Sequence, residues 1–189
     1  MSYNLFMNKK LYVISGCSGV GKGTVINEFM KRNSNDFVLS VSCTTRQPRQ
    51  GEVDGVNYFF LTHDEFEKNI KEDKFLEHAN FAGNYYGTKK KYINQKLDEG
   101  YNVVLEIDTQ GAFQVKSKMP EAILIFIVPP SVEELEKRLR GRHTEDEATI
   151  QKRLAQVKIE LERSQKYDYT VINDSVERAV EEIEKITKK

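Results

Sequence analysis

Two patterns of apolar and polar positions recur along the chain, and each predicts a different kind of element. Short apolar runs predict strands at residues 11–15, 58–61, 103–107, 123–128 and 169–172. Two of these runs, 103–107 and 123–128, are nearly continuous and rich in β-branched residues, which is typical of strands buried on both faces of a parallel sheet. Residues 37–43 alternate apolar and polar side chains, and this predicts a strand with one buried face.

Helical patterns separate these strands. Thr62, Ser131 and Thr144 are each followed three residues later by glutamate, the spacing of a capping box at a helix start; Asp174 and Glu177 are a weaker example. Further helices are predicted at residues 22–32 and 176–186, and an apolar stripe follows residues 150, 154, 157 and 161. Strands alternating with helices predict βαβ units, so we expect an α/β fold with three layers and a mostly parallel central sheet. Residues 59–86 break the alternation, which favours a separate lobe inserted into the sheet domain.

Composition narrows the functional classes. The 189 residues predict one domain with a sizeable core. The 29 basic and 29 acidic residues sum to zero net charge, which argues against binding to nucleic acid or to an anionic membrane. The longest apolar run, residues 122–128, is far shorter than the ~20 residues of a membrane span. With no apolar leader before Lys9 and only two cysteines, Cys17 and Cys43, we expect a cytoplasmic protein in a reducing compartment.

A glycine-rich segment directly follows the first predicted strand and opens the first predicted helix. It consists of Gly16, Cys17, Ser18, Gly19, Val20, Gly21, Lys22, Gly23 and Thr24. This context is typical of a phosphate-binding loop, in which backbone N–H groups, a helix N-terminus and a lysine surround phosphate oxygens. The alternative is a glycine-rich turn without a ligand, and the lysine disfavours it.

One position departs from the usual phosphate-loop pattern. Gly23 stands directly after Lys22, where a serine or threonine normally supplies a hydroxyl to Mg²⁺. We therefore predict no direct protein ligand for Mg²⁺, which phosphates and water would hold, with Thr24 as the one candidate hydroxyl.

A second anion site is predicted after the strand at residues 37–43. Arg46 and Arg49 lie three residues apart in a segment, residues 42–50, that contains no carboxylate. Two guanidinium groups at this spacing suit a phosphate dianion. Further polar residues follow at Tyr58, Glu77, Tyr86, Thr88, Glu106 and Asp108.

Taken together, these segments resemble guanylate kinases from about residue 11 to residue 174. The matching blocks, in order, are GCSGVGKGT, SCTTRQPRQGEVDGVNYFF, FLEHANFAGNYYGT, LEIDTQG and PPSVEELEKRLRGR. The resemblance implies a P-loop nucleoside monophosphate kinase of purine nucleotide metabolism that transfers the γ-phosphoryl group of MgATP to GMP, giving ADP and GDP.

The resemblance also implies a role for each matching residue. The GMP phosphate would be bound by Arg46, Arg49, Tyr58 and Tyr86. The guanine base would face Ser42, Glu77 and Thr88, with Glu106 and Asp108 completing the GMP site. A carboxylate at Glu77 could accept hydrogen bonds from both N1–H and N2–H₂ of guanine, which adenine lacks. Glu106 occupies a position where many family members have aspartate.

The C-terminal third supplies the remaining candidates. Arg138, Arg140 and Arg142 crowd the end of one predicted helix, where their mutual repulsion would favour an arriving anion. The resemblance places Arg142 and Arg153 in a mobile lid over ATP, and Arg138 and Asn173 near the adenine. Direct in-line transfer then requires positioning and positive charge, for which Lys22, Arg49, Arg142 and Arg153 are the catalytic candidates.

The predicted organisation is one guanylate kinase-like domain that acts as a monomer. Its core would span about residues 9–43, 89–140 and 168–189, its GMP-binding lobe about 44–88 and its lid about 141–167. Two alternatives remain: a non-catalytic protein-binding module of the same family, and a kinase for another mononucleotide such as AMP. The retained lysine and arginines argue against the first, and Ser42, Glu77 and the tyrosines argue against the second.

Overall fold

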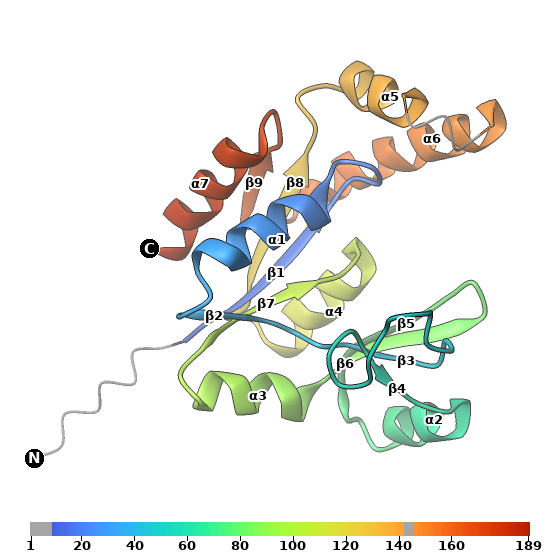
Figure 1. Cartoon of the computed structure of the whole chain (residues 1–189), viewed down its shortest axis with the longest axis vertical. Helices are drawn as coiled ribbons and strands as arrows, with labels where there is room; N and C mark the ends of the chain where they lie inside the picture. The colour runs from blue at the N-terminus through green and yellow to red at the C-terminus, as the bar shows by residue number, and fades with distance from the viewer. Residues whose placement is uncertain (1–8, 142–145) are drawn as a thin grey trace, which may run out of the picture. The chain divides into compact units, whose positions relative to one another are not determined.

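The computed structural model describes residues 9–141 and 146–189, except for the side chain of Arg138. Two compact units divide the chain. Unit 1 comprises Met1–Tyr12 and Asp36–Ala122, and unit 2 comprises Val13–Asn35 and Ile123–Lys189. Figure 1 shows the elements of both units in chain order by colour.

A five-stranded sheet has the strand order β2-β7-β1-β8-β9. Its strands are β1 (Leu11–Gly16), β2 (Phe37–Leu39), β7 (Asn102–Glu106), β8 (Ile123–Val128) and β9 (Tyr169–Ile172). The pairs β2–β7 and β8–β9 are parallel. The interior residues of β7 and β8 are fully buried, as the apolar runs predicted. The predicted α/β fold with a mostly parallel central sheet is therefore confirmed.

In unit 1 a second sheet has the order β4-β3-β6-β5. Its strands are β3 (Cys43–Thr44), β4 (Phe59–Phe60), β5 (Phe75–Phe81) and β6 (Asn84–Lys89). Strands β5 and β6 pair antiparallel through the two turn residues Ala82 and Gly83. Both turn residues have positive φ angles, 50° and 78°, which is the backbone of the tight hairpin turn whose twist matches that of the strands.

Helix α2 (His63–Lys71) covers the apolar side of this second sheet. Phe66 of α2 is fully buried and stacks on Phe75 of β5 with ring centroids 4.3 Å apart. The capping box predicted at Thr62 is present: its side chain accepts from the Glu65 N–H, and Glu65 accepts in return from the Thr62 N–H. The remaining helices of unit 1 are α3 (Lys90–Asp98) and α4 (Thr109–Lys118).

The described residues of unit 2 contain four helices. They are α1 (Lys22–Arg32), α5 (Val132–Arg140), α6 (Glu147–Ser164) and α7 (Val176–Thr187). Helices α1 and α7 pack on each other (Figure 1), and each has buried residues, among them Phe29 of α1 and Val180 of α7. In the described residues, no helix is both long and apolar enough to cross a membrane.

One predicted strand was wrong. Residues 37–43 form two strands in different sheets: β2 ends at Leu39 in the five-stranded sheet, and β3 begins at Cys43 in the second sheet. Apolar and polar residues alternate from Leu39 to Cys43, across the break, although β2 buries only Phe37 and both residues of β3 are buried. The pattern reports burial and contains no information about which sheet a strand joins.

The sequence predicted where helices begin more accurately than which residue caps each helix. At α5 the Ser131 side chain accepts from the Glu134 N–H as expected. At α7 the cap is Ser175, which accepts from the Arg178 N–H, so the weaker prediction at Asp174 was one residue early. The cap predicted at Thr144 lies outside the described residues, and α6 begins after Asp146, whose side chain accepts from the Thr149 N–H.

Candidate active site

A cleft of about 220 Å³ opens in unit 1 between the second sheet and the end of β7. Its polar lining contains Ser42, Tyr58, Glu77, Tyr86, Glu106 and Asp108, and its apolar lining includes Ala79, Phe81 and Ile107. Six of the nine residues predicted for the GMP site thus line one cleft, although they come from four separate stretches of sequence.

Glu77 is the buried acid of this cleft. It pairs with Thr88 across the β5–β6 ladder, so the two side chains project on the same side of the sheet. The Thr88 hydroxyl donates a 2.6 Å hydrogen bond to Glu77 Oε1, and Ser42 Oγ lies 3.4 Å from Thr88 Oγ1. Burial leaves Glu77 only 4% exposed and raises its pKa to about 7, against the opposing effect of the Thr88 hydrogen bond.

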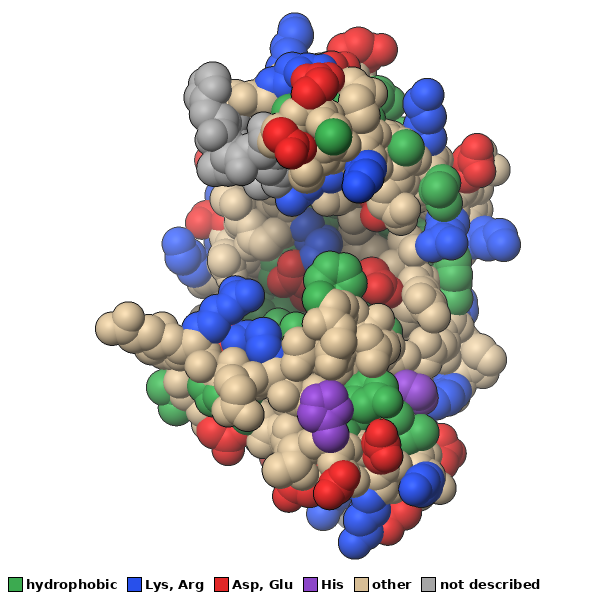
Figure 2. All heavy atoms as spheres, turned by 90° about the vertical axis from the view of Figure 1, so that its right-hand side faces the viewer, with side chains coloured by type: hydrophobic (Ala, Val, Ile, Leu, Met, Phe, Trp, Pro, Cys, Tyr) green, Lys and Arg blue, Asp and Glu red, His purple; other side chains and the backbone are tan. Residues whose placement is uncertain are grey.

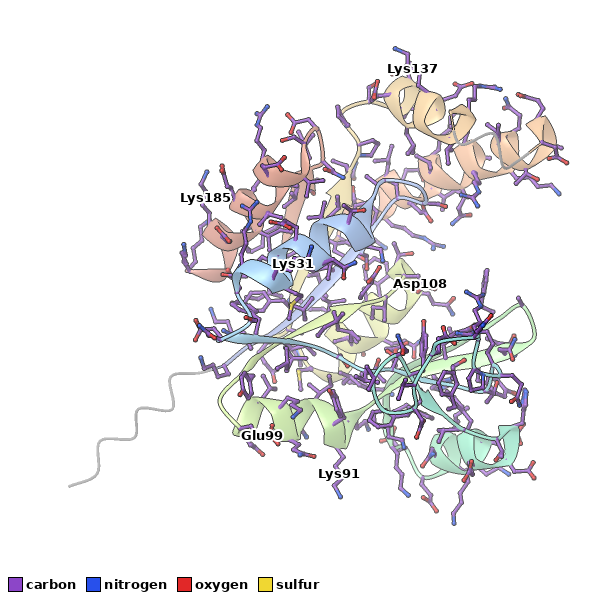
Figure 3. The ribbon with its side chains drawn as sticks, in the orientation of Figure 1. Lys31, Lys91, Glu99, Asp108, Lys137 and Lys185 are labelled. Carbon is purple, nitrogen blue, oxygen red and sulfur yellow. The ribbon has the colours of Figure 1, made fainter. Side chains whose placement is uncertain are left out.

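Helix α4 approaches this carboxylate closely, at Gly111. A Cβ atom at Gly111 would lie 3.0 Å from Glu77 Oε2, closer than ordinary van der Waals contact. Asp108 caps the same helix, and its Oδ1 accepts a 2.8 Å hydrogen bond from the Gly111 N–H. Figure 3 shows Asp108 at the N-terminal end of α4. Glu106, at the end of β7, is exposed.

Arg46 lies beside the aromatic part of the cleft. Its guanidinium group sits 5.6 Å from the centre of the Tyr58 ring, and the Tyr58 and Tyr86 rings make an edge contact at 6.2 Å. Glu52 holds Arg46 through two hydrogen bonds of 2.8 and 3.0 Å to Arg46 Nη2. Glu52 also accepts a 2.7 Å hydrogen bond from the Arg49 N–H, which fixes the turn that presents both arginines. The side chain of Arg49 itself is exposed.

In unit 2, the glycine-rich segment forms a loop between β1 and α1. Gly19 and Gly21 have φ angles of 83° and 87°, in the left-handed region that glycine adopts without a steric penalty. The Cys17 N–H bonds to Ile127 O, and the Val20 N–H bonds to Cys17 O. The N–H groups of Gly19 and Gly21 have no hydrogen-bond partner within the described residues. Lys22 begins α1, whose first turn contains no acidic residue.

Two side chains from elsewhere in unit 2 brace this loop. Asn173 is buried, and its Nδ2 donates a 2.7 Å hydrogen bond to Val20 O. Glu160 of α6 accepts a 3.1 Å hydrogen bond from the Ser18 N–H. The structure therefore gives Asn173 a contact with the loop backbone, whereas its predicted place near adenine remains a prediction.

The candidate lid residues are described only in part. Arg142 lies outside the described residues, and the structure places Arg138 on α5 without its side chain. Arg153 is partly buried on α6. Arg140 is bound by Glu136 at 2.7 Å and by Glu147, whose pKa this contact lowers to about 2. Arg140 thus already has two carboxylate partners and does not require an arriving anion, contrary to the expectation from the crowded arginines.

Comparison with known proteins assigns the chain to a family. The sequence profile described as guanylate kinase matches residues 8–189. The chain belongs to the guanylate kinase family. It is 53% identical to the guanylate kinase of Clostridium acetobutylicum over 182 residues, which are 95% of this chain and 86% of that protein. It is 49% identical to the guanylate kinase of Latilactobacillus sakei over 176 residues, 93% of this chain and 87% of that protein.

Solved structures agree with this assignment. The crystal structure of guanylate kinase from Anaplasma phagocytophilum matches with a TM-score of 0.73 and 33% identity, covering 95% of this chain and 85% of that one. Shikimate kinase from Bacteroides thetaiotaomicron matches with a TM-score of 0.50 at 11% identity, covering 95% and 99% of the two chains. At that identity, the second match shows a shared fold alone.

The phosphate loop of this guanylate kinase-family chain has few groups that could bind Mg²⁺. Among the described residues, no group of three or more His, Cys, Asp or Glu side chains could hold a metal ion. A Cβ at Gly23 would meet nothing within 4 Å, and Thr24 is exposed. Residues 16–24 themselves supply N–H donors for phosphate and contain no carboxylate, so they fit a metal ion that is held by the nucleotide phosphates.

Sequence reasoning missed several residues of the two sites. Glu52 was not predicted as a partner of Arg46, although it lies six residues away across a glycine turn. Phe81 lines the cleft, although its side chain is 73% exposed. Its position next to the hairpin turn was the sequence signal that could have identified it. Glu160 gave no signal at all, because its partner Ser18 is 142 positions away.

Proposed function

We propose that the protein transfers the γ-phosphoryl group of MgATP to GMP, giving ADP and GDP. The observation that carries this proposal is the carboxylate of Glu77 in the cleft, with the Thr88 hydroxyl bonded to one of its oxygens. A buried carboxylate is costly unless a ligand or a partner compensates for it. Its presence in a cleft therefore indicates recognition of a donor-rich ligand.

Guanine is the nucleobase that fits this acceptor. Its N1–H and N2–H₂ are adjacent donors, and the ionised Glu77 carboxylate can accept both, whereas adenine presents an acceptor at N1. A site that leaves a buried carboxylate unpaired with the wrong base rejects that base strongly. We place Ser42, Thr88, Glu106 and Asp108 around the nucleoside, because Thr88 donates to this acid and the other three line the same cleft.

The GMP phosphate is proposed to lie at the arginine end of the cleft. The cleft volume of about 220 Å³ is below the ~300 Å³ at which small-molecule pockets usually begin. A nucleoside fills it, and the phosphate then extends toward Arg46, Tyr58 and Tyr86. Glu52 already orients the Arg46 guanidinium, so less side-chain entropy is lost when the phosphate binds. Arg49 is exposed and reaches the same phosphate from the turn.

ATP is proposed to bind the loop of residues 16–24 in unit 2. The open N–H groups of Gly19 and Gly21, the N-terminus of α1 and Lys22 supply donors and positive charge to its phosphates. The Mg²⁺ that accompanies ATP neutralises part of the phosphate charge during transfer. Lys22, Arg49, Arg142 and Arg153 are the cations that would stabilise the transferring group, with Arg138 and Asn173 beside the adenine.

A substrate panel tests this proposal. Purified protein with MgATP would be offered GMP, AMP, CMP and UMP while ADP formation is measured. We expect turnover with GMP at least 100-fold above the other three nucleotides. Absence of turnover with GMP would refute the proposal, and preference for AMP would favour the alternative of a different mononucleotide kinase. Binding without turnover would favour the protein-binding module.

A pair of variants connects the specificity to Glu77. Glu77→Gln replaces one acceptor by a donor that faces the guanine donors, so kcat/KM for GMP should fall at least 100-fold and base choice should relax. Glu67→Gln is the matched control, because Glu67 is an exposed acid on α2 of the same unit. The control should leave kcat/KM for GMP within twofold of the parent value. We also propose that the enzyme is a cytoplasmic monomer; its two cysteines are free thiols, which suits a reducing compartment.

A further inference from the structure

The phosphate loop of unit 2 carries a carboxylate of the protein itself. Glu160 Oε2 accepts a 3.1 Å hydrogen bond from the Ser18 N–H. Ser18 belongs to the loop proposed to bind ATP, and Glu160 lies on α6, 142 residues further along the chain. A backbone N–H of this loop is the kind of donor that a phosphate oxygen accepts from, so the carboxylate occupies an anion position.

The negative charge of Glu160 acts on Cys17, a residue of the phosphate loop. Burial raises the pKa of the Cys17 thiol to about 12, and Glu160 is the next contributor to that rise. Because two negative charges a few ångströms apart repel each other unless a cation lies between them, a nucleotide phosphate at this loop is disfavoured while Glu160 stays in place.

Some backbone N–H groups of the loop are already bonded within the protein, and others are available to a phosphate. The Cys17 and Val20 N–H groups are used within the protein, and the Ser18 N–H is taken by Glu160. The N–H groups of Gly19 and Gly21 are open in the described structure. Ser18 is thus the one loop donor, of those just named, whose acceptor is an ionisable side chain that can move away.

Helix α6 connects this contact to the lid. Arg153 precedes Glu160 by seven residues, two helical turns, so both side chains lie on the same face of α6 and about 10 Å apart. Ile150, Leu154 and Val157 form the buried stripe of this helix. One partly buried face of this helix, beside the buried stripe, therefore carries both a candidate cation for the γ-phosphate and a carboxylate at the phosphate loop.

We propose that Glu160 is a positioning residue that competes with nucleotide phosphate for the Ser18 N–H and so couples nucleotide binding to α6. Phosphate binding displaces the carboxylate from the loop, and α6 loses one of its attachments at the same step. Glu160 therefore lowers the affinity for ATP. Binding of ATP then requires that α6 is released from the loop. This inference rests on the proposed ATP site.

Three variants and three nucleotides test the proposal by calorimetric titration in the presence of Mg²⁺. Glu160→Gln keeps the size and the acceptor oxygen of the side chain and removes its charge. We expect its Kd for ATP to fall about fivefold, and the gain should increase in the order AMP, ADP, ATP as the number of phosphates rises. A residue that only supports the fold would show no such dependence on phosphate number. Glu162→Gln is the control, because it removes the same charge from an exposed position of α6.

Each outcome decides between the hypotheses. An unchanged or higher Kd for ATP in Glu160→Gln overturns the proposal, and so does an equal gain in Glu162→Gln. If Glu160→Gln fails to fold, Glu160→Asp is the deciding variant: its shorter side chain withdraws from Ser18, and the same direction of change is required. Absence of ATP binding by the unsubstituted protein would refute the proposed function itself, a result separate from equal binding by all variants.

Hydrogen exchange supplies an independent readout. The Ser18 amide should exchange slowly in the unsubstituted protein without nucleotide and at least tenfold faster in Glu160→Ala, because the variant removes its acceptor. Equal exchange rates would show that the contact is absent in solution, which overturns the proposal.

Discussion

Replacing Glu77 by glutamine should make the ligand-free protein more stable while it damages GMP binding. Glu77 is 4% exposed and has a pKa of about 7 in the fold, whereas an unfolded glutamate has a pKa of 4.5. Folding therefore disfavours its ionised form, and the penalty exists only where the unfolded chain would be ionised. The glutamine variant has no ionised form, and its Oε1 can still accept from the Thr88 hydroxyl.

The size and the pH range of the effect follow from the two pKa values. Below pH 4.5 the side chain is protonated in both states and there is no penalty. Between pH 4.5 and about 7 the folded state holds more protons than the unfolded state, so the stability of the parent protein falls as the pH rises. Above pH 7 the penalty is complete. With 1.36 kcal/mol for each pKa unit, a rise from 4.5 to about 7 gives a penalty of about 3 kcal/mol.

Urea unfolding at two pH values measures this difference. The free energies of unfolding of the parent and of Glu77→Gln should agree within about 0.5 kcal/mol at pH 4.5 and differ by about 3 kcal/mol at pH 8, with the variant more stable. Glu67→Gln should show no such pH-dependent gap. A gap of equal size at both pH values, or a less stable variant at pH 8, would refute the assignment of a costly buried carboxylate.

Three further substitutions test other parts of the two sites. Arg49→Ala should lower kcat at least 100-fold with an unchanged melting temperature, since the side chain is exposed and acts on transferring charge; a change in KM for GMP alone would argue against a catalytic role. Gly111→Ala should raise KM for GMP at least tenfold and destabilise unit 1 by about 1–3 kcal/mol, because its Cβ would lie 3.0 Å from Glu77 Oε2; equal values in both proteins would show that α4 relaxes freely. Gly23→Ser should fold normally, because its Cβ meets nothing within 4 Å, and should lower the Mg²⁺ concentration needed for half-maximal rate severalfold by adding a hydroxyl ligand; an unchanged Mg²⁺ dependence would show that the hydroxyl does not reach the ion.

The sequence predicted the core strands and the first helix well because their signals are local. The runs at 123–128 and 169–172 and the helix at 22–32 have the observed bounds, since burial, β-branching and the glycine-rich turn define them over a few residues. The break between Leu39 and Cys43 could not be predicted, because the choice between two sheets depends on strand partners that lie 16 to 65 residues away.

The features of the candidate site also fall into those that the sequence predicted and those that it could not predict. The residues of the unit 1 cleft were predicted as a set because the resemblance placed them there, and the structure brings six of them to one cavity. The pKa of Glu77 and the hydrogen bonds of Glu52 and Glu160 could not be predicted, since burial and long-range contacts decide them. Figure 2 shows basic and acidic side chains interspersed over the visible face, so neither sign of charge dominates that face.

The two native cysteines make this chain convenient for site-directed labelling. Cys17 and Cys43 are free and buried, and burial raises their thiol pKa values to about 12 and about 11. At pH 7 the reactive thiolate fractions are then on the order of 10⁻⁵ and 10⁻⁴. Cysteines introduced at the exposed positions Lys91 in unit 1 and Lys137 in unit 2 (Figure 3) would react with maleimide dyes far faster than the native pair. A donor and an acceptor dye at these positions would report, by energy transfer in a single molecule, any change in the distance between the two positions during turnover.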